Sequence, residues 1–226
     1  MASVCYITTT IEPCYGDRKY ETTQELAEGA HGGDLLAAYY LAQHYEEKQD
    51  YNKAAELYML VSKCREPLIF ADSNMPLTPQ CEAEYAIGCF YEKGLLPNSS
   101  MEKAVEWFLK SVDDGGSDAC YKMAELHMTG SYVEQDYDKA VNYLYNGYYE
   151  FGRNDAAFEL ACKLEGKTST GQDVVYEILA DCYTWGIGVE NDSNKADIYY
   201  AKLGQLPHKM DNETKKDANR YNELPF

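Results

Sequence analysis

Basic residues are scarce in this chain of 226 residues: 20 lysines and arginines stand against 38 aspartates and glutamates, and the formal net charge is −18. A folded surface with this charge repels nucleic-acid phosphates and anionic lipids, and it attracts basic molecules over a long range. Direct binding of DNA or RNA is therefore not expected, and a protein partner with a basic surface is favoured. Solubility alone explains the acidity equally well.

Long apolar runs are also absent. No stretch approaches the ~20 apolar residues that a membrane-spanning helix needs. Residues 1–17, MASVCYITTTIEPCYGD, contain neither the basic segment nor the apolar run of a secretory signal peptide. We therefore expect a cytoplasmic protein with no membrane contact.

The cysteines show no C-x-x-C spacing, and most of the eight lie within apolar helical patterns rather than in loops. We interpret them as reduced thiols that pack as small hydrophobic side chains, without a disulfide framework. They are Cys5, Cys14, Cys64, Cys81, Cys89, Cys120, Cys162 and Cys182.

Catalytic motifs are missing too, including phosphate-binding glycine loops, the zinc-binding H-E-x-x-H and the G-x-S-x-G nucleophile turn. The four histidines lie far apart without metal-ligand spacing, and His44 and His127 are expected to pack within the fold. Neighbouring carboxylates such as Glu46–Glu47, or Glu82 and Glu84, are expected to be solvated, because a chain this acidic produces them by chance. The sequence thus predicts a protein that is not an enzyme and has no cofactor or metal.

What the chain does contain is an internal repeat. Its clearest copy, AEYAIGCFYEKGLLPNSSMEKAVEWF, starts at Ala83, and ACYKMAELHMTGSYVEQDYDKAVNYL starts 36 residues later at Ala119. A third copy, VYEILADCYTWGIGVENDSNKADIYY, starts at Val175, and AAYYLAQHYEEKQDYNKAAELY near the front has a turn four residues shorter. A degenerate copy, AAFELACKL from Ala156, lacks its second half. A period of this kind is typical of stacked repeats.

The anchors of each copy recur at helical spacing, so each copy is predicted to form a helical hairpin. A small residue at the sixth position lets a neighbouring helix approach, and a glycine at the twelfth suits the left-handed residue that ends a helix. Because one hairpin cannot bury its own apolar face, the hairpins are expected to stack into an all-α, right-handed α-solenoid with a concave and a convex surface. The expected caps of the second helices are Asp50, Ser99, Asp136 and Ser193.

At these anchors the chain resembles the Sel-1-like repeat branch of the tetratricopeptide family. The stretch DCYTWGIGVENDSNKADIYY, residues 181–200, is similar to the family pattern at almost every position. The resemblance implies a solenoid over residues 22–204, between an extension of residues 1–21 and a polar tail or cap of residues 205–226. It implies protein binding on the concave surface and no shared catalytic site. The predicted repeats are 34–64, 83–116, 119–152, the degenerate 155–165 and 173–204, with a loop insertion at 65–80.

One bacterial branch of this family, the cysteine-rich repeat proteins, binds penicillins and has been linked to β-lactamase activity. The resemblance would then imply one disulfide per repeat, with C-x7-C spacing. Cys81 and Cys89 have that spacing, but both fall inside one predicted helix and the spacing does not recur. A penicillin-binding or β-lactamase-like role is therefore the less favoured alternative.

The fourth, seventh and eleventh positions of each first helix remain after core positions are assigned, and they share one stripe. If the first helices line the concave surface, as they do in related solenoids, this stripe is the expected binding face. Its aromatic and acidic side chains suit a partner with arginine or lysine hot spots, although Tyr40 and Trp185 could equally pack against neighbouring helices. The predicted partner-binding residues are Tyr40, Gln43, Glu47, Lys93, Lys122, Glu125, Glu159, Asp181 and Trp185.

Together these features favour a non-catalytic protein-interaction module. One hypothesis is an inhibitor, such as an immunity protein against a nuclease or an anti-defence factor, that neutralises a basic protein. An adaptor or scaffold within a larger complex is the alternative, and the residues do not separate the two. The half-repeat is expected to bend or interrupt the superhelix between Gly152 and Gln172, and the run of residues 68–70 is either an edge contact or a docking tip.

Overall fold

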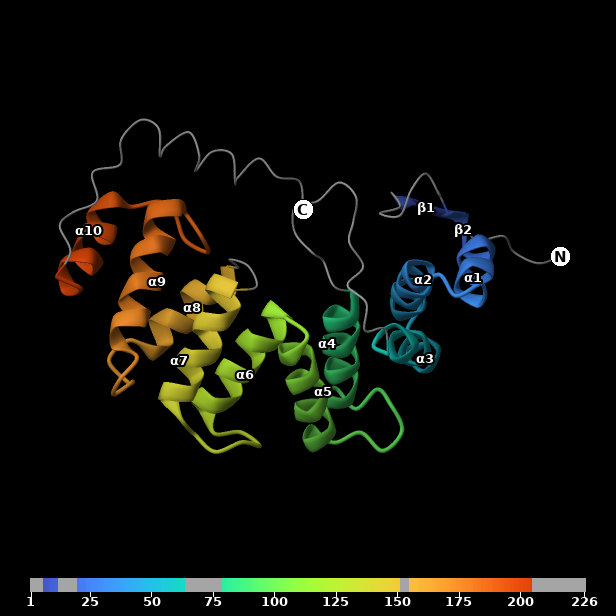
Figure 1. Cartoon of the computed structure of the whole chain (residues 1–226), viewed down its shortest axis with the longest axis horizontal. Coiled ribbons are helices and arrows are strands. Elements are labelled where there is room, and N and C mark those ends of the chain that lie inside the picture. The colour runs from blue at the N-terminus through green and yellow to red at the C-terminus, as the bar shows by residue number, and fades with distance from the viewer. Residues whose placement is uncertain (1–5, 12–19, 64–78, 151–154, 205–226) are drawn as a thin grey trace. The chain divides into compact units, whose positions relative to one another are not determined.

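A computed structural model describes residues 6–11, 20–63, 79–150 and 155–204 (Figure 1). Residues 1–119 and 120–226 form two units, which are taken one at a time. The predicted tail of residues 205–226 lies outside the described residues, and so does the predicted loop of residues 65–80, except for its last two residues, which begin a helix.

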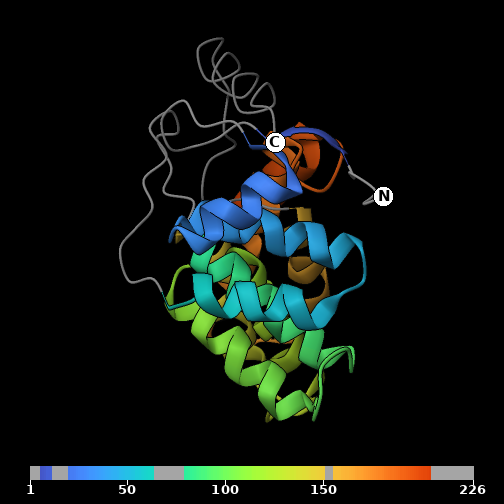
Figure 2. The same ribbon diagram turned by 90° about the vertical axis from the view of Figure 1, so that its right-hand side faces the viewer.

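The first unit is built from helical hairpins, which Figure 2 shows in succession from the amino terminus. Helix α1 (Thr23–His31) packs on α2 (Leu35–Glu47), which forms a hairpin with α3 (Tyr51–Val61), and α3 packs on α4 (Pro79–Glu92). Helix α4 forms the second hairpin with α5 (Met101–Asp113). A short antiparallel pair, β1 (Tyr6–Ile11) and β2 (Tyr20–Thr22), precedes α1 and was not predicted from the sequence.

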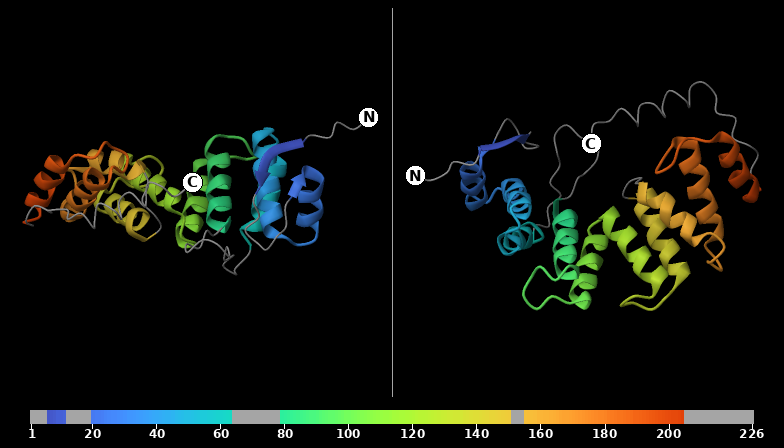
Figure 3. Two further views of the ribbon diagram at one scale, coloured as in Figure 1. Left: turned by 90° about the horizontal axis from the view of Figure 1, so that it is seen from above. Right: turned by 180° about the vertical axis from the view of Figure 1, so that it is seen from behind.

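The second unit begins within α6 (Ser117–Thr129), which is followed by α7 (Tyr137–Tyr145) and a π-helical turn (Asn146–Glu150). A single helix, α8 (Asp155–Leu164), occupies the segment predicted as a half-repeat, and it packs against both α7 and α9 (Gln172–Trp185) (Figure 3). Helices α9 and α10 (Ser193–Lys202) form the last hairpin. The all-α helical-repeat fold predicted from the sequence is confirmed.

Each unit has its own apolar core. In the first, Leu41, Tyr58 and Phe90 are at most 4% exposed, and in the second Leu144 and Leu164 are fully buried. Burying one such side chain contributes about 1.5–3 kcal/mol. The alanine that follows the repeat lysine is buried in every full hairpin, which makes it a contact point between paired helices; these residues are Ala54, Ala104, Ala140 and Ala196.

The glycines at the twelfth repeat position end their helices as predicted. Gly94 and Gly130 have a φ of 72°, and Gly186 has a φ of 74°, so all three adopt the left-handed conformation. In the front hairpin, whose turn is shorter, Gln49 takes this conformation with a φ of 60°.

The capping residues of the second helices are confirmed in two hairpins and shifted by one residue in the others. Asp50 and Asp136 accept a backbone N–H in the first turns of α3 and α7. The cap of α5 is Ser100 rather than Ser99, because the Ser99 hydroxyl bonds instead to the backbone N–H and carbonyl of Leu96 in the preceding turn. Helix α10 is capped by Asp192, since its carboxylate accepts two N–H groups and makes the predicted cap, Ser193, the first helical residue.

A carboxylate fixes the turn between α8 and α9 in the second unit. Asp138, in the first turn of α7, accepts hydrogen bonds from the Thr168 hydroxyl, from the Ser169 hydroxyl at 2.5 Å, and from the backbone N–H groups of Ser169 and Thr170 at 3.1 and 3.0 Å. The Ser169 and Thr168 hydroxyls and the Thr170 N–H hold the pKa of Asp138 far below its usual range. The turn therefore depends on the ionised form of this side chain.

The close approach of α4 and α5 depends on Gly88. A Cβ atom built on Gly88 would lie 2.5 Å from the Phe108 ring and 3.3 Å from the Ala104 carbonyl oxygen. We predict that Gly88→Ala destabilises the chain by about 1–3 kcal/mol, as overpacking does in well-packed cores. Urea unfolding measures the change. In an uncrowded helix the same substitution stabilises by about 1 kcal/mol, so a gain in stability would contradict this account.

Acid sensitivity tests the role of Asp138. Because its pKa is lowered in the folded state, its contribution to stability is present at neutral pH and is lost as the pH falls below the ordinary aspartate value of about 3.9. We predict that Asp138→Asn lowers stability at pH 7, speeds amide exchange at Ser169 and Thr170, and flattens the acid side of the stability curve. Asp113→Asn, at an exposed position in α5, is the control. An unchanged acid midpoint and unchanged exchange in Asp138→Asn would refute the prediction.

Candidate protein-interaction surface

In the first unit, the predicted stripe runs along α2. Tyr40 and Gln43 are half-buried and Glu47 is exposed. The Gln43 amide donates to the Tyr39 hydroxyl at 3.1 Å, and the rings of Tyr39 and Tyr40 meet edge to face at 5.8 Å. Lys93 is exposed but lies one residue beyond the end of α4. This part of the stripe therefore offers an aromatic ring, an amide and a carboxylate at successive helical turns.

In the second unit, the stripe residues lie on three helices and most of the charged ones already have partners. Lys122 and Glu125 in α6 form an ion pair at 3.4 Å. Glu159 in α8 is paired with Lys163, one turn further along the helix. These carboxylates remain at the surface, where ion pairs are weak and exchange readily with other cations.

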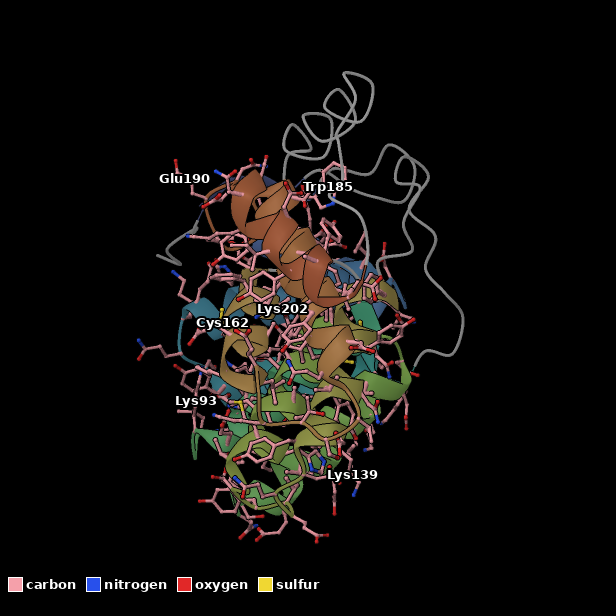
Figure 4. The ribbon with its side chains drawn as sticks, turned by 90° about the vertical axis from the view of Figure 1, so that its left-hand side faces the viewer. Lys93, Lys139, Cys162, Trp185, Glu190 and Lys202 are labelled. Atoms are coloured by element: carbon pink, nitrogen blue, oxygen red, sulfur yellow. The ribbon has the colours of Figure 1, made fainter. Side chains whose placement is uncertain are left out.

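The α9 part of the stripe contains Asp181 and Trp185. The Asp181 carboxylate accepts a hydrogen bond from the Tyr200 hydroxyl at 3.2 Å. Trp185, labelled in Figure 4, is the last residue of α9 and is half-buried. This burial does not separate the two explanations given for Trp185 from the sequence.

Two carboxylates that the sequence predicted to be solvated also accept hydrogen bonds from repeat tyrosines, and one of them, Glu82, is exposed as predicted. Glu46 accepts from the Tyr58 hydroxyl at 2.9 Å, and Glu82 accepts from the Tyr39 hydroxyl. Glu84 is only 3% exposed, so the prediction was wrong for this residue. It failed because it counted charges along the chain, whereas the packing of neighbouring helices decides which side chains are buried.

These tyrosines act as fixed donors. Burial, followed by the nearby Glu82, raises the pKa of Tyr39 well above its ordinary value, and burial with Glu46 does the same for the pKa of Tyr58. Burial and Glu165 likewise raise the pKa of Tyr199. The hydroxyls therefore stay protonated and anchor the carboxylates, which is a structural role rather than acid–base chemistry.

A pocket of about 380 Å³ opens between α3, α4 and α5 in the first unit. The sequence analysis did not predict it. The available signal was an aromatic residue and a lysine three residues apart, Trp107 and Lys110, whose ammonium lies 3.7 Å from the centre of the indole ring. The residues that line the pocket are Met59, Ser62, Lys63, Glu84, Trp107 and Lys110.

Comparison of the sequence with models of known protein families identifies the repeat that these hairpins form. The model of the Sel1 repeat matches residues 35–58, 81–116, 117–146 and 177–208, which together make up more than half of the chain. The chain belongs to the Sel1 repeat family. Sel1 repeats generally mediate protein–protein interaction and are typically not catalytic.

Solved structures with this architecture are distant in sequence. A protective antigen of uropathogenic Escherichia coli strains, displaying an SLR fold, is 20% identical with a TM-score of 0.46, and the match covers 90% of this chain and 52% of that chain. A Sel1 repeat protein from Oxalobacter formigenes is 19% identical with a TM-score of 0.45, over 88% of this chain and 91% of that one. The chain spans about half the length of the Escherichia coli antigen. No curated protein matches the sequence.

In the first and last Sel1 repeats, the repeat lysine forms a clasp at the start of the second helix. Lys53 lies 2.7 Å from its cap, Asp50, and 5.0 Å from the centre of the Tyr45 ring. In the last repeat, Lys195 lies 3.5 Å from Asp192 and 4.9 Å from the centre of the Tyr183 ring. The pairing of lysine, cap and aromatic ring joins the two helices of a hairpin at their turn.

In one Sel1 repeat, a histidine occupies the position of the tyrosine that the lysine contacts. His127 stands where the other full repeats have tyrosine; it is buried, and its ring stacks on Tyr143 at 5.5 Å. Its Nδ1 lies 3.0 Å from the carbonyl oxygen of Glu134. The prediction that His127 packs within the fold is confirmed.

The described thiols and acids were compared with the needs of a disulfide and of a metal site. Cys81 and Cys89 are reduced and lie eight residues apart in α4, a rise of about 12 Å, whereas a disulfide spans Cα atoms less than about 7 Å apart. No group of three histidine, cysteine, aspartate or glutamate side chains suited to a metal ion occurs in the described segments. Among the helices that the structure describes, none has the length and apolar character to cross a membrane.

Proposed function

We propose that this Sel1 repeat chain is a non-catalytic protein that acts in the cytoplasm and binds a basic protein through the stripe on its first helices. In the first unit the stripe comprises Tyr40, Gln43, Glu47 and Lys93. In the second unit it comprises Lys122, Glu125, Glu159, Asp181 and Trp185.

The contacts of the lysine ammonium groups are the main support for this proposal. Most lysines of the described segments have a carboxylate, a carbonyl or an aromatic ring of the same chain at their ammonium group, so few of them stand ready to pair with an acidic partner. These engaged lysines are Lys53, Lys103, Lys110, Lys122, Lys139, Lys163, Lys167, Lys195 and Lys202. The net charge of −18 makes the electrostatic field around the protein negative, and this field attracts cationic surfaces.

The side chains of the stripe suit such a partner. Aromatic rings such as Tyr40 and Trp185 provide flat, partly apolar contact area, and exposed carboxylates such as Glu47 and Glu159 pair with arginine or lysine. Arginine is especially suited to this mixture, because its guanidinium stacks on rings while it donates to carboxylates.

Within this class, the inhibitor hypothesis is preferred, with a nuclease toxin or a defence protein as the basic target. An inhibitor binds one partner tightly, whereas an adaptor binds several partners weakly, so the number and strength of the interactions separate the two. The reduced state and helical spacing of Cys81 and Cys89 weigh against the penicillin-binding alternative, which requires a disulfide in each repeat.

Partner capture at two salt concentrations tests the proposal. The immobilised full chain should retain a basic protein at low salt and release most of it at high salt, because exposed charges are screened. Removing one stripe carboxylate from each unit, with Glu47→Gln and Glu159→Gln together, should weaken the affinity at least about tenfold. Isothermal titration with the captured protein measures the change.

A matched double variant controls for net charge. Glu28→Gln and Glu190→Gln remove the same two charges from exposed positions outside the stripe, one in each unit, and should change the affinity by less than about threefold. Equal losses in both double variants would show that only the overall charge matters, and capture that is insensitive to salt would rule out a basic partner.

A further inference from the structure

The pocket in the first unit combines a buried carboxylate with an aromatic face. Glu84 from α4 is 3% exposed, and Trp107 from α5 lines the same pocket. Lys110 covers the indole, with its ammonium 3.7 Å from the ring centre. Met59 supplies apolar contact from α3, and Lys63 is an exposed side chain at the same lining. A cation of this chain thus already lies on the aromatic wall of the pocket.

The last repeat of the second unit has corresponding residues at the same repeat offsets. Counted from the repeat lysine, Trp107 corresponds to Tyr199 and Lys110 to Lys202. Counted from the starts of the two repeats, Ala83 and Val175, Glu84 corresponds to Tyr176. The two clusters are therefore two versions of one position in the repeat.

In the second unit this position is a filled cation cage. The Lys202 ammonium lies 2.7 Å from Glu165 and 4.6 and 4.5 Å from the ring centres of Tyr176 and Tyr199 (Figure 4 labels Lys202). The Tyr199 hydroxyl donates to the other oxygen of Glu165 at 3.1 Å. Two rings and one carboxylate thus surround an alkylammonium group, as in sites that recognise cations.

We propose that the pocket lined by Glu84 and Trp107 receives a lysine or arginine side chain of the basic partner, and that Lys110 is an internal stand-in which this side chain displaces. The inference rests on the proposed function for the source of the cation. The pocket volume of about 380 Å³ leaves room for a side chain, whereas the equivalent position in the second unit is filled by Tyr176 and Lys202. A guanidinium group fits best, since its flat face stacks on indole while its edge donates to a carboxylate.

Tryptophan fluorescence tests this proposal directly. The chain has two tryptophans, so Trp185→Phe leaves Trp107 as the only reporter in the full-length protein. N-acetyl-arginine amide is the probe, and N-acetyl-citrulline amide is its neutral counterpart of nearly equal shape. In this background, Lys110→Ala should tighten arginine-amide binding at least about fivefold, because the competing ammonium is gone. The citrulline amide should cause no saturable change in either protein.

Two further variants control the interpretation. Lys202→Ala removes the equivalent lysine in the second unit and should leave the Trp107 titration unchanged. Glu84→Gln keeps the shape of the buried side chain and, added to Lys110→Ala, should abolish the gain; circular dichroism verifies that this variant is folded. The proposal is overturned if Lys110→Ala gives no gain in affinity or if citrulline amide binds as well as arginine amide.

This test is independent of the stripe. Failure of the arginine-amide titration, together with successful salt-sensitive capture of a basic protein, would reject the pocket and keep the proposed function. Saturable arginine-amide binding without any basic partner would leave a cation pocket and reject the proposed function.

Discussion

A helical hairpin cannot bury its own apolar face, and this constraint determines most of the structure. In the first unit, Leu41, Tyr58 and Phe90 come from three different helices and are buried only because successive hairpins pack together. Close packing in turn requires small residues at the contacts, which explains Gly88 against the Phe108 ring and the buried alanine after each repeat lysine. The second unit meets the same constraint with α8, a single helix packed against α7 and α9.

Tyrosine and lysine side chains make similar polar contacts in different repeats. Tyrosine hydroxyls bind carboxylates between helices, as Tyr58 does with Glu46 and Tyr199 with Glu165. In the first and last repeats, Lys53 and Lys195 bind the capping aspartates and lie over aromatic rings. The side chains of Lys53, Lys139 and Lys195 are each more than half exposed, so these contacts lie at the surface of the hairpins. The surface attracts cations because acidic residues outnumber basic ones, 38 to 20.

The sequence predicted the features that follow from local spacing. The helical hairpins, the left-handed glycines and the close approach at Gly88 all follow from offsets along the chain, and the structure confirms them. The helix caps were predicted only to within one residue. Ser99 and Ser100 can both cap α5, and Ser100 does so because the Ser99 hydroxyl donates to the Leu96 carbonyl in the preceding turn. Burial of Glu84 depends on helices distant in sequence, so charge patterning gave the wrong answer for it. The binding stripe remains a prediction, and the pocket became visible only when α3, α4 and α5 were placed together.

Amide chemical-shift mapping of the full chain with a hexa-arginine peptide, at physiological salt, tests the central claim most directly. The claim is that specific helices, rather than net charge alone, select a cationic partner. The account predicts saturable shifts along α2 around Tyr40 and Glu47, along α9 around Trp185, and at the pocket around Trp107. Weak, non-saturating shifts spread over exposed acids such as Glu28 and Glu190 would contradict it, because they would show that the peptide is attracted only by the overall charge.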